Sequence, residues 1–180
     1  MTILTGIIYP ILVTVIGQTI FHEKSNGSMI VVDGKVVGSE LIGQKFIGSQ
    51  YFSSRPSAID YNPIPSGASN LSVTSSELQL RAKRNTFAFD SINQLPPNQR
   101  IPSEMIYASG SGLDPHISPT AALLQVNRIC KTRHLGGTKV KEMENLISQT
   151  TESRQFGFLG EERINVLKLN LVIDKMFTIK

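Results

Sequence analysis

The chain has 180 residues, a mass of 19.8 kDa and a formal net charge of +4, from 18 Lys and Arg against 14 Asp and Glu. This length fits one domain of ordinary size, and the small, scattered positive excess does not indicate a nucleic-acid-binding surface. The charges are unevenly distributed, because no charged side chain precedes Glu23. The composition excludes a polytopic transporter and a disordered tail and indicates a small anchored domain.

Residues 2–21 form a mainly apolar stretch without a charge. As a helix it would be about 30 Å long, which is the thickness of the hydrocarbon core of a bilayer. A secretory signal peptide is one alternative, but its apolar core is shorter, and no Ala precedes Ala58 to form the usual cleavage site. A buried soluble helix is the other, which its glycines and proline disfavour. We predict a retained transmembrane helix over residues 1–22 and one domain over residues 23–180.

Four small or backbone-exposing residues recur along this helix at intervals of four, four and three. They are Gly6, Pro10, Thr14 and Gly17. Such a stripe lets a second helix approach closely, which is how helices associate in lipid. The stripe therefore predicts a membrane partner, and the alternative is a lone anchor with incidental glycines.

The flanking charges do not settle the orientation of this helix. Lys24 and Lys35 follow it, and a count of positive charges would place the domain in the cytoplasm. Long domains, however, translocate largely regardless of such charges.

The remaining chain alternates short regular elements with loops. Residues 28–39 predict a β-hairpin, because Asp33-Gly34 suits the positive φ angles of a type I′ turn. Between Ser53 and Pro119, abundant Pro, Ser, Asn and Gly indicate ordered loops. One helix interrupts them, with a capping box at Thr74 and Glu77. Its predicted inward residues are Leu78, Ala82, Asn85, Phe89 and Ile92.

Three further elements are predicted toward the C-terminus. Ser118 and Pro119 are typical of the start of a helix, and Thr138 is expected to cap the next one. The inward residues of these two helices are Ala122, Val126, Ile129, Val140, Met143 and Ile147. Leucines and isoleucines alternate with other residues over 163–174, which predicts a β-strand. The expected fold class is α+β, with a mixed domain rich in ordered loops.

The residues that carry chemistry are few. Cys130 is the only cysteine, and the three histidines have no metal-site spacing, so we predict no catalytic residue and no metal ligand. The run Ser109-Gly110-Ser111-Gly112 could present backbone N–H groups to a phosphate, but no Gly-Lys-Ser/Thr follows it. The Asp-Lys-Thr-Gly motif of P-type ATPases is also absent, since Asp174-Lys175 precedes Met-Phe.

Several sequence blocks together resemble a known family. In chain order they are Gly-Ile-Ile-Tyr-Pro at 6–10, Phe-Ser-Ser-Arg-Pro-Ser-Ala at 52–58, Ser-Gly-Ala-Ser-Asn-Leu at 66–71, Ala-Ser-Gly-Ser-Gly-Leu-Asp-Pro-His-Ile-Ser-Pro at 108–119 and Gly-Glu-Glu-Arg-Ile-Asn-Val-Leu at 160–167. The chain is similar, essentially end to end, to the C subunit of the high-affinity potassium-transporting ATPase, the KdpC family.

The resemblance implies an accessory subunit that is not itself an enzyme. In that family a channel-like subunit selects K⁺, a P-type subunit hydrolyses ATP and a small helical subunit stabilises both. The C subunit is anchored in the cell membrane by a single pass, and its domain lies outside the cytoplasm. The alternative hypothesis from another class is a membrane-anchored binding or sensor module that has no role in transport.

The resemblance also implies specific residues. Arg55, Asn70, Asp114 and Asn165 are expected to organise the loops that face the partner subunits. Family members are described as catalytic chaperones that raise the ATP affinity of the ATPase subunit, with no firmly bound cofactor and ATP as a transient ligand. The candidate nucleotide contacts are Gln125 and the loop Ser109–Gly112, and the alternatives are a surface helix residue and a tight turn. A domain outside the membrane cannot touch cytoplasmic ATP, so this role requires indirect coupling.

Overall fold

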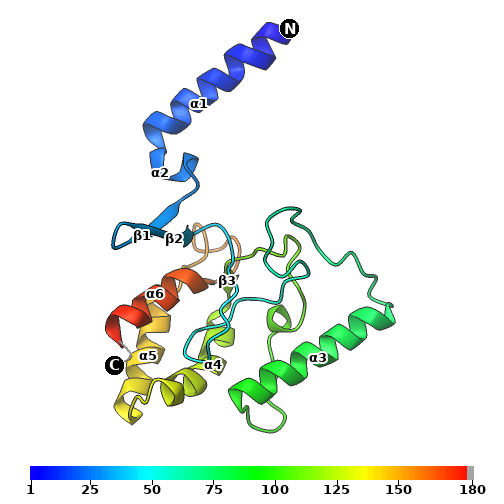
Figure 1. The fold of residues 1–180 in the computed structure, drawn as a ribbon, viewed down its shortest axis with the longest axis vertical. Helices are drawn as coiled ribbons and strands as arrows, with labels where there is room; N and C mark the ends of the chain where they lie inside the picture. Colours follow the sequence, from blue (N-terminus) through cyan, green and yellow to red (C-terminus); the bar gives the residue numbers. More distant parts are fainter. Residues whose placement is uncertain (178–180) are drawn as a thin grey trace. The chain divides into compact units, whose positions relative to one another are not determined.

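A computed structural model describes residues 1–177. The chain divides into two compact units, Met1–Ile42 and the part from Gly43 onward. Helices and short two-stranded sheets occur in the same chain (Figure 1), so the predicted mixed α/β character is confirmed.

The first unit begins with a continuous helical backbone over residues 2–20. It contains a π-helical segment, η1 (Leu4–Ile8), followed by α1 (Tyr9–Ile20), and a short helix α2 (His22–Ser25) comes next. The π-helical turn η1 lies just before Pro10. Proline has no N–H to donate to the Gly6 carbonyl, and its ring would clash with that carbonyl in a regular α-helix. The Tyr9 amide instead donates to the Leu4 carbonyl, five residues earlier.

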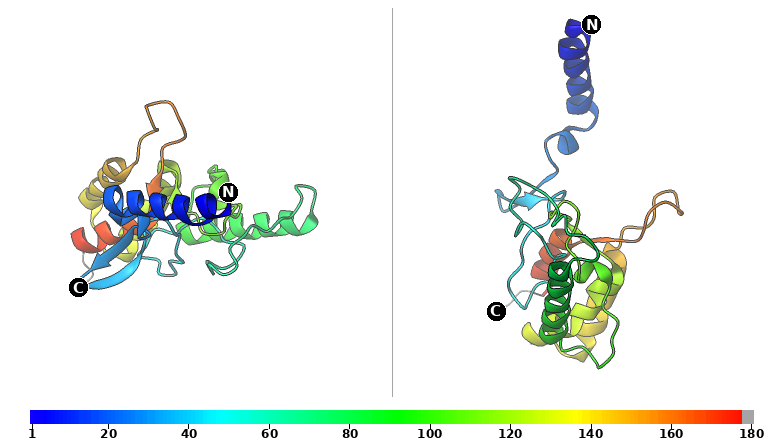
Figure 2. Two further views of the ribbon diagram at one scale, coloured as in Figure 1. Left: turned by 90° about the horizontal axis from the view of Figure 1, so that it is seen from above. Right: turned by 90° about the vertical axis from the view of Figure 1, so that its right-hand side faces the viewer.

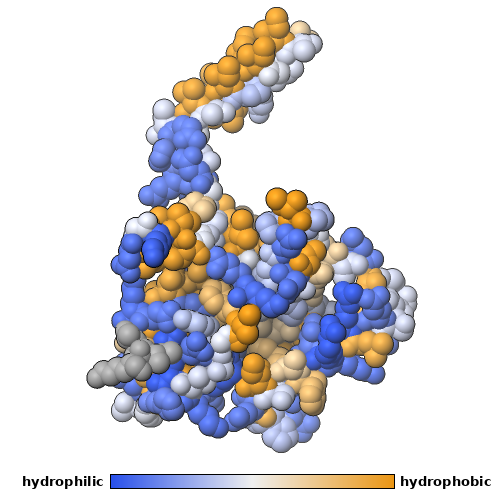
Figure 3. Space-filling model, viewed as in Figure 1, coloured by the Kyte–Doolittle hydropathy of each residue, from blue (hydrophilic) through white to orange (hydrophobic). Residues whose placement is uncertain are grey.

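The side chains of this helical run are mostly apolar and exposed. Hydrophobic residues cover much of the visible face of α1, with a paler strip along one edge (Figure 3). Within residues 1–177, no single helix combines the length and the apolar content that crossing a membrane requires.

The predicted hairpin is confirmed in the same unit. Strand β1 (Met29–Val32) pairs antiparallel with β2 (Lys35–Ser39). Asp33 and Gly34 form the turn with φ angles of 50° and 75°, so both adopt the left-handed region that this dipeptide tolerates.

The second unit holds the hydrophobic core. Its elements are α3 (Ser76–Asn93), η2 (Ser103–Met105), β3 (His116–Ile117), α4 (Pro119–Thr132), α5 (Gly137–Thr150), β4 (Ile164–Asn165) and α6 (Val166–Met176). Helices α4, α5 and α6 enclose the core, and the loop of residues 152–163 projects from this unit (Figure 2). The long loops expected before Pro119 are present.

Helix α3 differs from its prediction at both ends. It starts at Ser76 after Ser75, so the expected cap at Thr74 is wrong. Phe89 is buried as predicted, but Ile92 is exposed, and Asn93 is buried instead. Asn93 can be buried because its amide donates to the Phe89 carbonyl and its oxygen accepts from Arg128.

Helix α4 starts as predicted. The Ser118 hydroxyl accepts a hydrogen bond from the Ala121 amide at 3.1 Å, with Pro119 as the first helical residue. All the predicted inward residues of α4 and α5 are buried or half-buried. The expected cap at Thr138 is wrong, because α5 begins at Gly137 after Gly136 and no side chain caps it.

The C-terminal strand prediction is wrong, because only β4 is extended and α6 follows at once. Asn165 accepts from the Lys168 amide at 3.1 Å and so caps this helix. The buried residues of α6 recur at helical spacing and include a polar one: Val166, Leu167, Leu169, Asn170 and Ile173. Over a short run, alternating leucines are compatible with the spacing of a strand and with that of a helix. A strand would place Asn170 on the outer face, opposite the leucines, whereas the helix buries it.

Two buried amide side chains hold the loop segment Phe52-Ser53 between α4 and α6. Asn170 accepts from the Phe52 amide at 2.8 Å and donates to its carbonyl at 3.0 Å. Gln125 accepts from the Ser53 amide at 2.8 Å and lies 3.5 Å from its carbonyl. Because buried backbone groups need partners, these amides do for this segment what a neighbouring strand would do. We call the four residues the amide clamp.

We expect Asn170→Leu to lower the free energy of unfolding by about 2–4 kcal/mol, because it leaves the N–H and C=O of Phe52 buried without partners. Urea unfolding of the full chain in detergent measures this. The same substitution at exposed Asn127 on α4 is the matched control and should change stability by less than about 0.5 kcal/mol. Equal effects at the two positions would contradict the clamp.

Candidate functional site

A polar cluster lies beside the β3–β4 pair and contains three of the four residues assigned to the partner-facing loops. An ion pair joins Arg55 Nη1 to Asp114 Oδ2 at 2.6 Å, with both side chains about a quarter exposed. The two residues are 59 positions apart in the chain. Arg55 approaches along the segment that leaves the amide clamp, and Pro115 restricts Asp114 to extended conformations.

His116 completes the surroundings of the Asp114 carboxylate. Its backbone amide donates to Asp114 Oδ1 at 3.0 Å, and its ring Nδ1 lies 3.5 Å from the same oxygen. Partial burial by itself would raise the pKa of Asp114, but the hydrogen bonds from His116 and the charge of Arg55 outweigh it and lower the pKa to about 2. Asp114 is therefore a carboxylate at neutral pH.

Asn165 joins this cluster through the backbone. It pairs with His116 in the antiparallel β3–β4 register, and its buried side chain caps α6. Its amide is thus occupied within the fold. Asn70 lies instead on an exposed loop with a φ angle of 52°, and the structure links it to none of the other three.

A groove of about 410 Å³ opens next to the ion pair. The side chains that line it are predominantly charged: Arg55, Glu104, Asp114, His116, Ile117, Ser118, Glu161, Glu162 and Arg163. Ser118 donates its hydroxyl to Glu104 while its oxygen caps α4. The groove is therefore a mainly charged surface, and the ion pair and the Ser118–Glu104 bond hold several of its side chains in place. Among residues 1–177, no three His, Cys, Asp or Glu side chains converge as a metal site would need.

The glycine loop Ser109–Gly112 forms a tight turn, as the alternative reading expected. Gly112 has a φ of 71°, and a Cβ there would lie 2.6 Å from Ile59, so only glycine fits. The Ser109 and Gly112 amides donate to the Pro56 and Ser109 carbonyls. The amide of Leu113 donates to the Ser111 hydroxyl. Gly110 is exposed with open space at its Cβ position. A phosphate contact at this loop stays a prediction.

Gln125 is fully buried, so the reading of it as a surface helix residue is wrong. Besides Ser53, its Oε1 accepts from Arg128 Nη2 at 2.9 Å, and its Nε2 donates to the Ala121 carbonyl at 3.2 Å. A nucleotide could reach this amide only if these contacts opened. The predicted nucleotide contact at Gln125 is untested and stays a prediction.

The four residues of the predicted stripe, Gly6, Pro10, Thr14 and Gly17, all lie on the helical run of residues 2–20. The Thr14 hydroxyl donates to the Pro10 carbonyl at 2.7 Å, so these two share one side. A Cβ at Gly6 would meet nothing within 4 Å, and one at Gly17 would meet only Ser25 at 3.6 Å. This chain therefore leaves open space beside Gly6, whereas Ser25 of α2 already contacts the position at Gly17.

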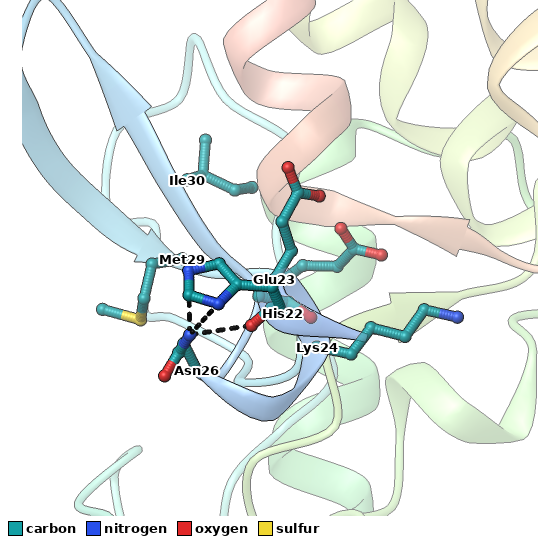
Figure 4. A pocket seen from close by; sticks show the side chains of 8 residues that line it. His22, Glu23, Lys24, Asn26, Met29 and Ile30 are labelled. Atoms are coloured by element: carbon teal, nitrogen blue, oxygen red, sulfur yellow. Dashed lines mark hydrogen bonds between the residues drawn. The ribbon is translucent and has the colours of Figure 1, made fainter. Parts of the chain in front are cut away.

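A hollow of about 390 Å³ lies after the helical run of the same unit, lined by His22, Glu23, Lys24, Asn26, Ser28, Met29, Ile30 and Glu40. Figure 4 shows the Asn26 amide pointing toward the His22 ring, with its Nδ2 lying 3.3 Å from Nε2. The same nitrogen donates to the His22 carbonyl at 2.8 Å, which closes the end of α2. These contacts are local and indicate a structural role.

Sequence reasoning missed the parts played by His116 and Glu104. The spacing of the three histidines excludes a metal site and indicates no other role for His116. The spacing Asp114-Pro115-His116 was the available signal, since an Asp side chain commonly accepts from the backbone amide two residues on. Nothing local indicated Glu104, which meets Ser118 from across a loop.

Comparison with known proteins identifies the family. The model of the family described as "K+-transporting ATPase, c chain", KdpC, matches residues 1–175. A "Potassium-transporting ATPase KdpC subunit" of Methylococcus capsulatus is 47% identical over 179 residues, covering 97% of this chain and 92% of the relative. Those of Leptospira interrogans and Mycobacterium bovis are 44% and 40% identical, covering 99% and 97% of this chain and 90% and 92% of the relatives.

Each of these matches covers nearly the whole of this chain and of the relative. They confirm the resemblance that the five sequence blocks indicated, and they give the sensor hypothesis no support. The chain therefore belongs to the KdpC family, the c chain of K⁺-transporting ATPases.

Proposed function

We propose that this chain is a non-catalytic accessory subunit of an ATP-driven potassium uptake complex. The observation that carries the proposal is the family match over residues 1–175. The proposed partners are a channel-like subunit that binds K⁺, a P-type subunit that hydrolyses ATP and a small helical subunit.

ATP hydrolysis is assigned to the partner rather than to this chain. The phosphorylated aspartate of P-type ATPases stands in Asp-Lys-Thr-Gly, whereas Asp174-Lys175 is followed here by Met-Phe. Asp174 also forms an ion pair with buried Arg133 at 2.6 Å, which commits it to the fold. These two facts support a role in assembly rather than in the reaction.

The proposed membrane anchor is the helical run of residues 2–20. It carries no charged side chain, and apolar side chains such as Ile11 and Leu12 are more than half exposed. Burying such side chains in lipid or against other helices is favourable, whereas exposing them to water is not. Gly6, where a Cβ would meet nothing within 4 Å, offers a partner helix a close approach.

We expect Gly6→Leu to reduce copurification with the channel-like subunit about tenfold. The added side chain meets nothing in this chain but would obstruct a neighbouring helix, and a close helix contact of about 1.4 kcal/mol corresponds to that factor. Quantitative pull-down from detergent-solubilised membranes measures it. Val15→Leu adds bulk away from the small-residue stripe and should copurify normally. Because Leu favours helix more than Gly, lost helicity cannot explain the result. Normal copurification of Gly6→Leu would contradict this packing.

The unit from Gly43 onward is proposed to lie outside the cytoplasm. External trypsin is then expected to cut this chain in sealed spheroplasts, in the projecting loop where Arg154 is exposed. Mass spectrometry of the fragments gives the cleavage site, and a cytoplasmic protein in the same sample serves as the control for sealing. Cleavage only after permeabilisation would place the unit on the other side.

The proposed chaperone role raises the nucleotide affinity of the ATP-hydrolysing subunit through contacts between subunits. External placement requires this indirect route, because the candidate nucleotide contacts Gln125 and Ser109–Gly112 all lie in the second unit. The charged groove beside Arg55 and Asp114 is the proposed contact surface.

The complex without this chain is expected to have a higher KM for ATP than the complete complex. Gly110→Ala should leave the KM at the wild-type value, like the matched control Gly136→Ala, since both positions have open space at Cβ. Steady-state ATPase assays of the purified complexes measure this. A KM raised by Gly110→Ala alone would instead support direct contact between the glycine loop and the nucleotide.

A further inference from the structure

Helix α3 ends beside α4 in the second unit (Figure 1). A hollow of about 340 Å³ lies at this place. The residues that line it are Ser49, Ile92, Asn93, Gln94, Asn127, Arg128, Lys131 and Thr132. Two of them are cations, three carry side-chain amides, and none is a carboxylate. The hollow is therefore positively charged and rich in hydrogen-bond donors.

Arg128 is the buried member of this set and is only 7% exposed. Its guanidinium donates to Asn93 Oδ1 at 2.9 Å, to Gln125 Oε1 at 2.9 Å and to the Ser49 carbonyl. All three acceptors are neutral, and no ion pair among residues 1–177 includes Arg128. These bonds use three of its five N–H groups.

A second buried arginine on the same part of the chain provides the comparison. Arg133 is 6% exposed and also donates to backbone carbonyls, but Asp174 neutralises it at 2.6 Å. Burying a charge without a counter-charge is unfavourable. Burial lowers the pKa of Arg128 to about 10, yet the group remains protonated at neutral pH. Arg128 therefore holds an uncompensated positive charge at the wall of a hollow.

Lys131 adds a second charge one turn further along α4. It is exposed, and its Nζ lies 3.1 Å from Gln94 Oε1, which keeps the ammonium at the same hollow. A planar fork of donors and a mobile ammonium together are the groups that proteins use for phosphate oxygens.

We propose that this hollow binds an oxyanion of the phosphate class, held by the free N–H groups of Arg128 and by Lys131. The phosphate group has two sources, inorganic phosphate and the phosphates of a nucleotide. The site does not depend on the proposed function, because its residues all belong to this chain.

The test is a titration of the full chain in detergent with inorganic phosphate, followed by calorimetry and thermal melting at constant ionic strength. We expect saturable binding and a higher Tm in phosphate than in sodium chloride. Lys131→Gln should weaken phosphate binding about tenfold, the loss of one charge-assisted contact. Lys141→Gln, the same change at an exposed position of α5, should bind as the wild type does.

Arg128→Lys keeps the charge, loses the planar fork and should also weaken binding. Arg128 is buried and bonded to three residues of the fold, so the exposed Lys131→Gln is the deciding variant. ATP that displaces phosphate would identify the nucleotide as the source, and ATP that does not displace it would identify the free anion. Absence of saturable binding by the wild-type chain, or unchanged binding by folded Lys131→Gln, overturns the proposal.

Discussion

Phe52 is buried and Ser53 half-buried in a segment outside any helix or strand, and the second unit depends on how the backbone polar groups of this segment are satisfied. Within residues 1–177 no strand pairs with them, and they bond instead to Asn170 on α6 and Gln125 on α4. Both amides must stay in place for the segment to remain buried, which couples two helices that lie far apart in sequence. Phe52 belongs to the hydrophobic core, so the bonds from Asn170 anchor a core residue.

The amide clamp also helps to position two arginines, Arg55 and Arg128. Beyond Ser53, the chain brings Arg55 to Asp114, so the groove that we assign to partner contact is fixed by a core interaction. On the other side, Gln125 Oε1 also accepts from Arg128, which holds that guanidinium at its hollow. An amide predicted as a nucleotide contact thus has a well-defined structural role, and its substitution would disturb several sites at once.

How far the sequence predicted these features depends on whether the signal was local. The start of α4 was predictable because Ser118 and Pro119 contribute through their own backbone neighbours. The β1–β2 hairpin was predictable from Asp33-Gly34 for the same reason. Helix α6 was not, because its alternating leucines satisfied a strand period and only the partner of Asn170, 118 positions away, explains why an asparagine faces inward. In the candidate site, Asp114 stood out beside Pro115, but no sequence pattern indicates its pairing with Arg55.

The buried residues Arg128 and Arg133 show that the groups that position a guanidinium need not be the groups that neutralise its charge. Neutral oxygens position Arg128, and neutral oxygens also contact Arg133, because a hydrogen bond orients the planar fork whether or not its acceptor is charged. The carboxylate of Asp174 adds compensation for Arg133, and that carboxylate is itself 42% exposed, so access to solvent does not prevent pairing. Arg128 lines a hollow whose lining includes no carboxylate. Asn93, Gln125 and Ser49 therefore fix the position of the Arg128 guanidinium without neutralising it. The proposed oxyanion would supply the compensating negative charge.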